Sequence, residues 1–366
     1  MKKLLLLLVL LSNLAYAYPP VPFVQDNKVG YLDSSGKIVI EPKFDTPFHK
    51  LYLVFEQDSF PSFEFPEWAY FSEGKATVRI AKKFWFYTYG YKYAVINEKG
   101  EFVFEPTEDI IGKFQNGTAP YQNLMKTAEY VHGEKFGMIN SAAEVFIEPK
   151  YDFISHFSDN RALVRKGDKY GYIDTNGELV IPFLFIDAGK FNNGIAFAKN
   201  SRLYGYIDTS GNYIIPEKYE KAWDIIDGTA RYFDGNLFSF LKFENKGNFI
   251  NISQLTPNKF TDASDFSEGV ACVRDVNTNL YGYIDNQGKY VIEPQFLYAT
   301  PFSEGLAVAK KDKYFGFIDK SGSFIIPPEY DFAQNFYNGI AKVWKNNKLI
   351  FINKNNSEIY SFNLKF

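Results

Sequence analysis

Five aspartates recur at matching places along the chain and offer the carboxylates that acid–base catalysis needs. Each follows an aromatic-Gly-aromatic-Ile segment or a close variant, and they are Asp33, Asp174, Asp208, Asp285 and Asp319. A glycosidase, by contrast, uses two exceptional carboxylates that flank one glycosidic bond. Because these aspartates form a periodic series, the pattern predicts that each shapes a local turn and favours no catalytic pair.

The other residues that carry reactive chemistry are few and scattered. The histidines are His49, His132 and His156, and no His-x-x-x-His spacing occurs. The one cysteine, Cys272, lies in an alternating apolar segment that is typical of a buried strand. The sequence contains no Gly-x-Ser-x-Gly nucleophile motif and no glycine-rich phosphate loop. We therefore expect no catalytic residues, no metal site and no cofactor.

Residues 46–70 are the strongest candidate for a binding segment because aromatic side chains are concentrated there. The candidate binding residues are Phe48, Tyr52, Phe55, Phe60, Phe63, Phe65, Trp68 and Tyr70. Exposed aromatic rings often dominate the affinity of a surface for its partner. The alternative is that the segment folds back as an N-terminal cap over the first unit of a repeat array. The sequence leaves both interpretations open.

An internal repeat of about 34 residues supplies the elements that would position these side chains. Residues 170–182 recur with few changes at 204–216, 281–294 and 315–327, and an earlier copy spans 29–42. One turn position marks each copy, at Gly36, Gly100, Ala143, Gly177, Gly211, Gly247, Gly288, Gly322 and Asn356. A second motif, Phe-x-x-Gly-x-Ala, lies between consecutive turns. We predict about nine units over residues 18–366.

Each unit is predicted to contain three short β-strands. Runs such as Tyr-Ile-Asp and Val-Ile-Pro are rich in β-favouring residues, and Asp-x-x-Gly between them is typical of a tight turn. The turn needs a positive φ, so Asn356 fits and Ala143 predicts a distorted turn. Aromatic residues in register with the repeat predict stacked contacts between units. The glutamates before proline predict a weakly acidic edge, and they are Glu41, Glu105, Glu148 and Glu293.

This pattern resembles the WG repeat family, also called KWG repeats. The resemblance rests on the aromatic-Gly-aromatic-Ile-Asp strand, the turn glycine, the Ile-Pro or Glu-Pro ending and the Phe-x-x-Gly-x-Ala motif. Aromatic residues replace the family's tryptophan at Tyr170, Tyr204, Tyr281 and Phe315. The divergent copies at Tyr93 and Phe240 lose the glycine and have Ala94 and Leu241 in its place. The resemblance implies a β-repeat module that binds partners, and it implies no particular catalytic activity.

The predicted fold is an all-β array of tandem three-stranded repeats. A closed propeller usually completes its last blade with a strand from the other end of the chain. No half-unit is visibly split between the two ends of this sequence. The sequence therefore favours an open, twisted array, with a closed propeller-like ring as the alternative.

Composition and the first residues bound the class and the location of the protein. Of the 366 residues 46% are hydrophobic, which is ample for a buried core, and Lys+Arg 40 against Asp+Glu 43 gives no basic excess for nucleic acid. Residues 1–17 combine a basic start, an apolar run and Ala15-Tyr16-Ala17, the pattern of a cleavable signal peptide. No later apolar run is long enough for a transmembrane helix. We expect a secreted or periplasmic protein, and the Lys-, Asn- and aromatic-rich composition is typical of a bacterial chain.

These observations together predict a non-enzymatic binding or scaffold protein outside the cytoplasm. Its partner would be a protein or a cell-envelope glycan, recognised through the repeat surface or through residues 46–70. One alternative is a cell-envelope hydrolase with a site between repeats, which would require a cluster of unlike, non-periodic acidic residues and histidines. Another is a purely structural surface component.

Overall fold

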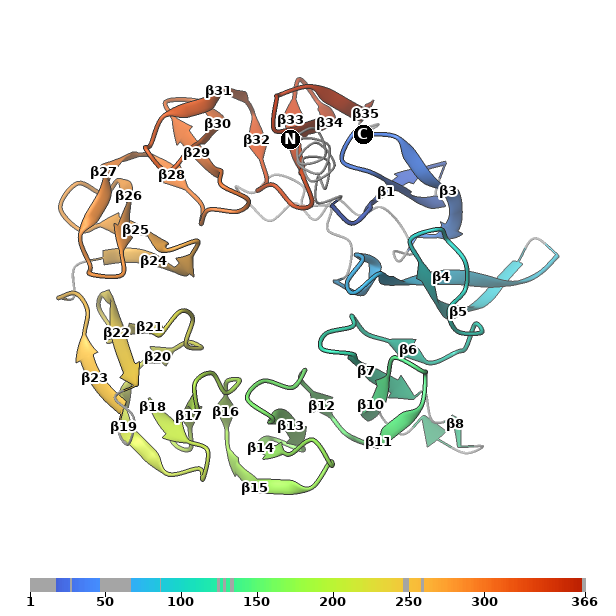
Figure 1. Cartoon of the computed structure of the whole chain (residues 1–366), viewed down its shortest axis with the longest axis horizontal. Helices are drawn as coiled ribbons and strands as arrows, with labels where there is room; N and C mark the ends of the chain where they lie inside the picture. The colour runs from blue at the N-terminus through green and yellow to red at the C-terminus, as the bar shows by residue number, and fades with distance from the viewer. Residues whose placement is uncertain are drawn as a thin grey trace, which may run out of the picture.

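The computed structural model describes residues 18–26, 28–46, 67–85, 87–123, 126–127, 130–131, 135–245, 250–257 and 260–363. Apart from η1 (Glu67–Ala69), a turn of 3-10 helix, the elements found there are β-strands. No helix in these ranges is long and apolar enough to cross a membrane. The strands form small antiparallel sheets that follow one another along the chain, which confirms the predicted all-β class (Figure 1). The predicted signal peptide, residues 1–17, lies outside the described residues.

The unit around Gly322 shows the basic pattern. Its strands pair in the order β28 (Tyr298–Ala299), β29 (Ala307–Lys311), β30 (Tyr314–Ile318) and β31 (Phe324–Tyr330). The last three are the strands that the sequence predicts. The two-residue strand β28 is added toward the centre of the molecule (Figure 1). This unit therefore runs from an inner short strand to an outer strand.

The other units repeat this order with variations. The first five-stranded sheet contains β1 (Val21–Gln25), β2 (Lys28–Leu32), β3 (Ile38–Asp45), β4 (Lys75–Phe84) and β5 (Tyr87–Asn97). Three four-stranded sheets follow, formed by β6 (Ile110–Ile111), β7 (Thr118–Asn123), β10 (Lys135–Asn140) and β11 (Val145–Tyr151); by β12 (Phe153–Ile154), β13 (Ala162–Lys166), β14 (Lys169–Ile173) and β15 (Leu179–Phe185); and by β16 (Asp187–Ala188), β17 (Ile195–Lys199), β18 (Tyr204–Asp208) and β19 (Tyr213–Tyr219).

Two units share an eight-stranded sheet because β22 also pairs with β24. Its strands are β20 (Lys221–Ala222), β21 (Thr229–Phe233), β22 (Phe238–Asn245), β23 (Ile250–Gln254), β24 (Phe260–Ser267), β25 (Val270–Asp275), β26 (Tyr281–Asp285) and β27 (Tyr290–Phe296). The last unit contains β32 (Phe332–Ala333), β33 (Ile340–Lys345), β34 (Lys348–Asn353) and β35 (Glu358–Asn363). A separate two-stranded sheet pairs β8 (Lys126–Thr127) with β9 (Tyr130–Val131).

The recurring aspartates shape turns, as the sequence predicts. The Asp174 carboxylate accepts hydrogen bonds from the backbone N–H groups of Asn176 at 2.9 Å and Glu178 at 3.0 Å. The expectation for Ala143 is wrong, because its turn closes in the same way. Ala143 takes a φ of 64°, and its N–H donates to the Asn140 carbonyl at 3.1 Å, much as Gly177 donates to Asp174 at 3.0 Å. The backbone of Ala143 is therefore strained by its positive φ, but the turn itself is not distorted.

The glycine of the aromatic-Gly-aromatic strand is required by a close backbone contact. In β30 a β-carbon on Gly316 would lie 2.5 Å from the Ile326 carbonyl oxygen. The ladder is bulged here, since Phe315 pairs with Tyr330 while Phe317 pairs with Ile326. The unit with Leu241 instead of glycine avoids this contact, because β22 and β23 pair in a regular register. The divergent copies are therefore units in which the outer strand pairs differently.

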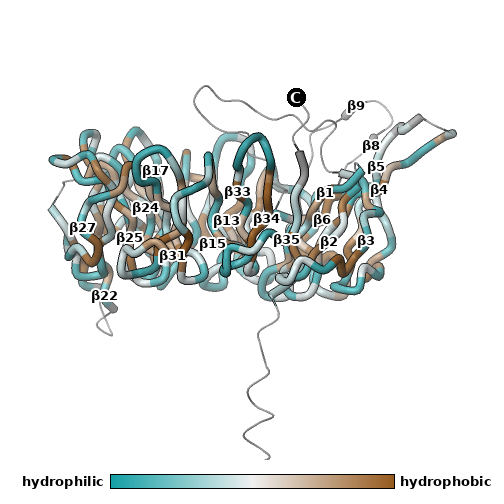
Figure 2. The backbone as a smooth tube through the Cα atoms, turned by 90° about the horizontal axis from the view of Figure 1, so that it is seen from above, coloured by the Kyte–Doolittle hydropathy of each residue, from teal (hydrophilic) through white to brown (hydrophobic). Residues whose placement is uncertain are grey.

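Hydrophobic clusters hold successive units together. Among the described residues there are nine such clusters, and each combines side chains from two neighbouring units. The predicted aromatic stacking is present in them. Tyr283 packs on Phe302 of the next unit with ring centroids 4.9 Å apart, and Phe317 packs on Phe336 at 4.8 Å. Seen edge-on, the hydrophobic stretches lie within the band of strands and the hydrophilic turns lie at its faces (Figure 2).

The units form a ring in which the first and last units are in contact (Figure 1). One of the clusters joins Val21 and Phe23 to Trp344 and Phe351, and the Phe23 and Tyr360 rings lie 5.1 Å apart. The arrangement is thus the ring that the sequence placed second, and not the open array that it placed first. The open array ranked first because ring closure was assumed to need a strand exchanged between the two chain ends. Here the sheets stay separate and side-chain packing joins the two ends.

Candidate functional site

Most of the predicted aromatic binding segment lies outside the described residues. This applies to Phe48, Tyr52, Phe55, Phe60, Phe63 and Phe65. Trp68 lies within η1, and Tyr70 follows directly after it. The structure therefore places only the C-terminal end of the segment.

That end packs onto the ring. The Tyr31 hydroxyl donates a hydrogen bond to the Ala69 carbonyl at 2.9 Å, and both residues are buried. The Tyr70 ring lies edge-on to Tyr337 of the last unit, with centroids 5.0 Å apart. Tyr70 thus reaches across the first unit and contributes to the contact between the two ends of the ring. This geometry supports the cap interpretation for the described end of the segment.

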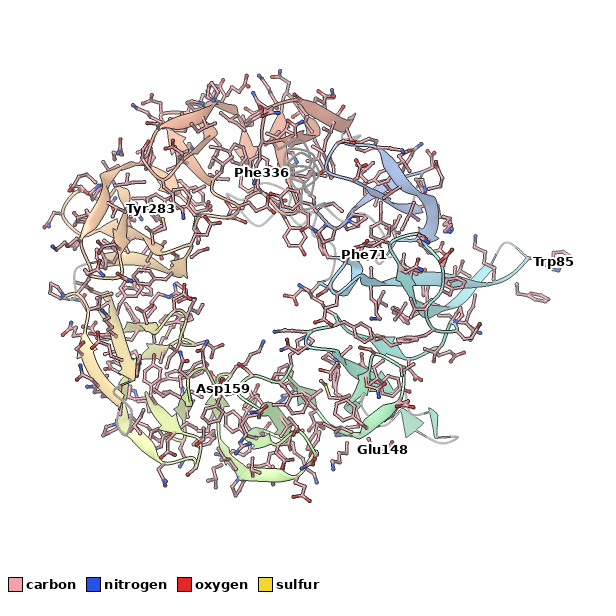
Figure 3. The ribbon with its side chains drawn as sticks, viewed as in Figure 1. Phe71, Trp85, Glu148, Asp159, Tyr283 and Phe336 are labelled. Carbon is pink, nitrogen blue, oxygen red and sulfur yellow. The ribbon has the colours of Figure 1, made fainter. Side chains whose placement is uncertain are left out.

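A different set of side chains is brought together by the Phe-x-x-Gly-x-Ala loops. These loops lie toward the centre of the ring, as the labelled Phe71, Asp159 and Phe336 show (Figure 3). The residue directly before the Phe or Ile that opens each loop motif differs among the units. We call these residues the inner rim, and they are Tyr70, Lys113, His156, Lys190, Asp224, Asp265, Pro301 and Asn335.

The inner rim contrasts with the residue that follows it. Phe71, Phe191, Phe302 and Phe336 are at most 2% exposed and fill the contacts between units. The rim residues themselves are partly or fully exposed in the described units. The position after the rim is therefore mostly a buried Phe, whereas the rim position holds several residue types. The described side chains leave the middle of the ring open in front of them (Figure 3).

One arc of the rim is basic. It consists of Lys113, His156 and Lys190 from three consecutive units. Burial lowers the pKa of the His156 imidazole, and the charge of Lys190 lowers that pKa further. The Nδ1 atom of His156 is buried without a hydrogen-bond partner in the described structure. At neutral pH this arc therefore carries two lysine charges and a neutral imidazole.

The next arc of the rim is acidic. The Asp224 carboxylate accepts a hydrogen bond from the Lys190 N–H at 3.0 Å, and Asp265 pairs with Arg231 at 3.1 Å. Burial raises the pKa of both carboxyls, and the opposing effects of Lys190 and Arg231 are smaller. Arg231 also lies over the Trp223 ring at 4.1 Å, which fixes its guanidinium in place. The acidic arc is therefore a set of oriented, partnered side chains.

Two cavities open beside these arcs. One of about 580 Å³ is lined by Glu67, Tyr70, Lys113, Asn335 and Lys342, so it spans the contact between the ends of the ring. Another of about 420 Å³ is lined by Arg231, Asp262, Asp265, Cys272 and Tyr281. Both lie within the size range of ligand sites in proteins. Both linings are largely apolar and include a few charged side chains that are suited to hydrogen bonding and ion pairing.

One carboxylate in the cavity next to Asp265 makes a contact that recurs in another unit. Asp262 accepts a hydrogen bond from the Tyr281 hydroxyl at 2.8 Å, as Asp187 does from Tyr204 at 2.7 Å. Asp262 is thus a repeated feature of the fold. Burial raises the pKa of the Cys272 thiol, which keeps it in the unreactive protonated form. Cys272 is buried, in agreement with the sequence.

No group of three or more His, Cys, Asp or Glu side chains in the described ranges is arranged to hold a metal ion. His49 and His132 lie outside those ranges, so His156 alone is placed. The glutamates before proline are exposed, and Glu148 lies at the outer edge of the ring (Figure 3). They are therefore far from the inner rim.

The sequence contained a signal for the inner rim that the periodic motifs concealed. Aligning the Phe-x-x-Gly-x-Ala loops places one position of changing charge directly before a constant apolar residue. Searching for motifs selects the constant positions. The variable position becomes meaningful only when the ring brings its members around one centre.

Comparisons with solved structures give distant likenesses. Hsv2 from Kluyveromyces lactis is 9% identical with a TM-score of 0.39, over 65% of this chain and 89% of that one. AztD from Citrobacter koseri is 10% identical with a TM-score of 0.37, over 75% of this chain and 92% of that one. No curated protein matches the chain.

The comparison with family models is more specific. The model described as "WG containing repeat" matches residues 30–46, 136–170, 170–201, 204–238, 281–314 and 315–348. These segments cover just over half of the chain, and they coincide with the units that keep the glycine of the aromatic-Gly-aromatic strand. The protein is a member of the WG-containing repeat family.

Proposed function

We propose that this protein is a non-enzymatic binding or scaffold protein that recognises its partner through the inner rim. The observation that carries the proposal is the division between a constant frame and a variable rim. The residue after the rim position is buried between units in seven of the eight loops, the exception being the half-buried Phe157, whereas the rim residue changes charge from Lys113 through Asp265. A loop position that varies in charge beside similar buried residues is typical of surfaces that recognise partners.

Binding is favoured over catalysis because the two carboxylates of the rim are already engaged. Asp224 is bonded to the backbone of Lys190, and Asp265 is paired with Arg231. A general acid or base must exchange its proton with a substrate, which such pairing opposes. Oriented charges that are held in place serve instead to select a partner of complementary charge.

The charge pattern of the rim favours a partner that carries both signs. Lys113 and Lys190 would attract acidic groups, whereas Asp224 and Asp265 would attract basic ones. A polypeptide segment and an amino- and carboxyl-bearing envelope glycan both meet this requirement. We place the partner in the cell envelope because residues 1–17 have the pattern of a signal peptide.

Cleavage of that signal agrees with the geometry at the contact between the ring ends. Removal after Ala17 would make Tyr18 the first residue of the mature chain. The Lys354 ammonium donates a hydrogen bond to the Tyr18 hydroxyl at 3.1 Å and lies over its ring at 5.4 Å. The mature chain would therefore start where the first and last units meet. N-terminal sequencing of the protein recovered from its native host tests this cleavage.

Capture of partners from the native envelope tests the binding function. The variant Lys113→Glu with Lys190→Glu reverses the basic arc and is expected to reduce capture at least tenfold. Its matched control, Lys99→Glu with Lys289→Glu, makes the same charge change at exposed turn positions and should capture normally. Equal capture by both variants and the wild type would overturn the rim as the recognition surface.

A further variant separates the rim from the aromatic segment. Replacing Phe60, Phe63 and Phe65 by serine removes rings of the predicted binding segment without touching the rim. Loss of capture in this variant alone would move recognition to residues 46–70 and leave the binding function standing. If the wild type captures no partner but cleaves an envelope glycan, the proposal of a non-enzymatic protein is wrong.

A further inference from the structure

The second unit, around Gly100, carries a longer hairpin than the regular units do. Its strands β4 and β5 contain 10 and 11 residues, whereas β29 and β30 at the same place in a regular unit contain 5 each. The added length carries the hairpin beyond the outer edge of the ring (Figure 1). Trp85 marks its far end (Figure 3). The extension therefore points away from the inner rim and into the surroundings.

The tip of this hairpin exposes two large aromatic side chains. Phe84 is 71% exposed and Trp85 is 83% exposed, and both values exceed those of the other exposed large hydrophobic side chains in the described residues. Their rings stack on each other with centroids 6.4 Å apart and an interplanar angle of 23°. Rings of this size are normally buried, so their combined exposure marks an interaction surface.

Trp85 is also an unfavourable choice for the turn that it occupies. Its φ is 55°, in the left-handed region that strongly disfavours bulky residues. The matching turns of other units place Asp26, Gly167, Asp312 and Asn346 at positive φ, all of them residue types that tolerate this region. A tryptophan at this position makes the turn less stable than Gly, Asp or Asn would. The contacts within the ring therefore do not explain a tryptophan at this position.

The residues around the tip indicate the chemistry of that contact. Lys82 and Lys83 precede the aromatic pair, and Lys82 forms an ion pair with Glu108 while Lys83 is exposed. From Ala81 to Thr88 the sequence contains no Asp, Glu, Asn or Gln. A sugar platform needs such groups to bond the sugar hydroxyls. Tryptophan and phenylalanine beside lysine are instead suited to the interface of an anionic bilayer.

We propose that the β4–β5 tip inserts Phe84 and Trp85 into the surface of an anionic phospholipid bilayer. The aromatic rings would lie at the level of the lipid headgroups, and Lys83 would approach the lipid phosphates. The ring would be held at its outer edge, which leaves the inner rim accessible to its own partner. This docking goes beyond the proposed binding function, because it uses a surface on the opposite side of the units.

Flotation with lipid vesicles tests the proposal. The full mature chain is mixed with vesicles of phosphatidylcholine alone or of phosphatidylcholine with phosphatidylglycerol, whose anionic headgroups attract lysine. We expect the wild type to float with the anionic vesicles and to bind neutral vesicles at least fivefold less. Trp85→Asn is expected to reduce binding at least tenfold, and Lys83→Glu severalfold.

The asparagine variant separates binding from folding. Asparagine tolerates positive φ, so Trp85→Asn should unfold at the same temperature as the wild type or at a higher one. The control Leu184→Asn removes an exposed apolar side chain from another unit and should leave flotation unchanged. Failure of the wild type to float would overturn the proposal, as would full flotation of Trp85→Asn. Concentration-dependent dimers of the wild type that vanish in Trp85→Asn, with no vesicle binding, would assign the tip to a second copy of this chain.

Discussion

The eighth unit (around Gly322) and the second unit (around Gly100) show which features every repeat needs and which can vary. In the eighth unit, β29 and β30 are short, Asp312 occupies the turn and Gly316 permits the close approach of β31. In the second unit the same hairpin is about twice as long, Trp85 occupies the turn and Ala94 replaces the glycine. Both units nevertheless bury the same kind of cluster at their junctions.

This difference separates the parts of a unit that hold the ring from the parts that are available for function. The strict part is the packing between units, where Phe317 and Tyr31 each contact an aromatic residue of the next unit. The hairpin beyond that packing can vary in length and in its turn residue. Residues that break a local rule without improving stability are expected at functional surfaces. Trp85 is such a residue, and the following substitutions test the comparison.

The largest effect is expected from the aromatic contact between units. Phe317 is fully buried against Phe336, so Phe317→Ala removes a large side chain from a packed core. We expect the free energy of unfolding to fall by about 3–5 kcal/mol. Urea denaturation followed by circular dichroism measures this loss. A loss below about 1 kcal/mol would mean that the junctions do not hold the ring.

A smaller loss is expected from the glycine that distinguishes the two units. In Gly316→Ala the new β-carbon would meet the Ile326 carbonyl, so we expect a loss of about 2 kcal/mol as the strands move apart. Ala94→Gly in the second unit adds no such contact and should cost about 1 kcal/mol or less. Parallel urea denaturation of the two variants provides the measurement. Equal costs would show that the bulge is not the reason for the glycine.

A gain in stability is expected at the strained turn of the third unit. Ala143 holds a φ of 64° where most other units have glycine. Ala143→Gly relieves this strain and should raise the free energy of unfolding by about 1 kcal/mol. Thermal unfolding measures the change. Gly177→Ala is the reciprocal control and should lower stability by a similar amount, and a gain there would contradict the turn argument.

The inner rim predicts a pH dependence of moderate size. Burial lowers the pKa of His156, so the unfolded chain binds the proton more readily and stability falls as the pH drops through the ordinary value of 6.5. Burial raises the pKa values of Asp224 and Asp265, so their contribution to stability rises as the pH drops, which is opposite to that of His156. His156→Gln should therefore weaken the loss of stability between about pH 7 and pH 5. An unchanged loss in this variant would place the responsible group elsewhere.

The smallest change in stability is expected at the hairpin tip. Trp85→Asn replaces an exposed side chain in a left-handed turn, so the free energy of unfolding should rise by about 0.5 kcal/mol or stay constant. Differential scanning calorimetry beside Phe317→Ala gives the contrast directly. A loss of more than about 1 kcal/mol would show that the tip supports the ring and would weaken its assignment as a free interaction surface.

Local features of the fold were predictable because they depend on residues close together in the sequence. Asp174 and Gly177 are three residues apart, and together they specify a turn in any context. Alternating apolar residues specify strands for the same reason. The expectation for Ala143 was wrong because the sequence records only the preference of alanine. The surrounding strands overcome that preference and impose the turn.

The candidate site was less predictable because its members lie 34–43 residues apart along the chain and belong to several residue types. Lys113, His156 and Lys190 become neighbours only through the curvature of the ring. The aromatic concentration at residues 46–70 was visible at once, yet its described end, Tyr70, packs on Tyr337 of the last unit. Composition identified the segment, whereas the direction in which Tyr70 points depended on contacts with a distant part of the chain.

The amino-acid sequence by itself determined the repeat, the strands, the turns and the membership of the WG-containing repeat family, because each rests on short-range patterns. Only the tertiary structure decided that the array closes. Closure depends on the small rotation between successive units, which accumulates around the ring and is set by the packing of side chains such as Phe23 against Tyr360. That accumulated rotation also decided which side chains face the centre and which, like Trp85, point outward.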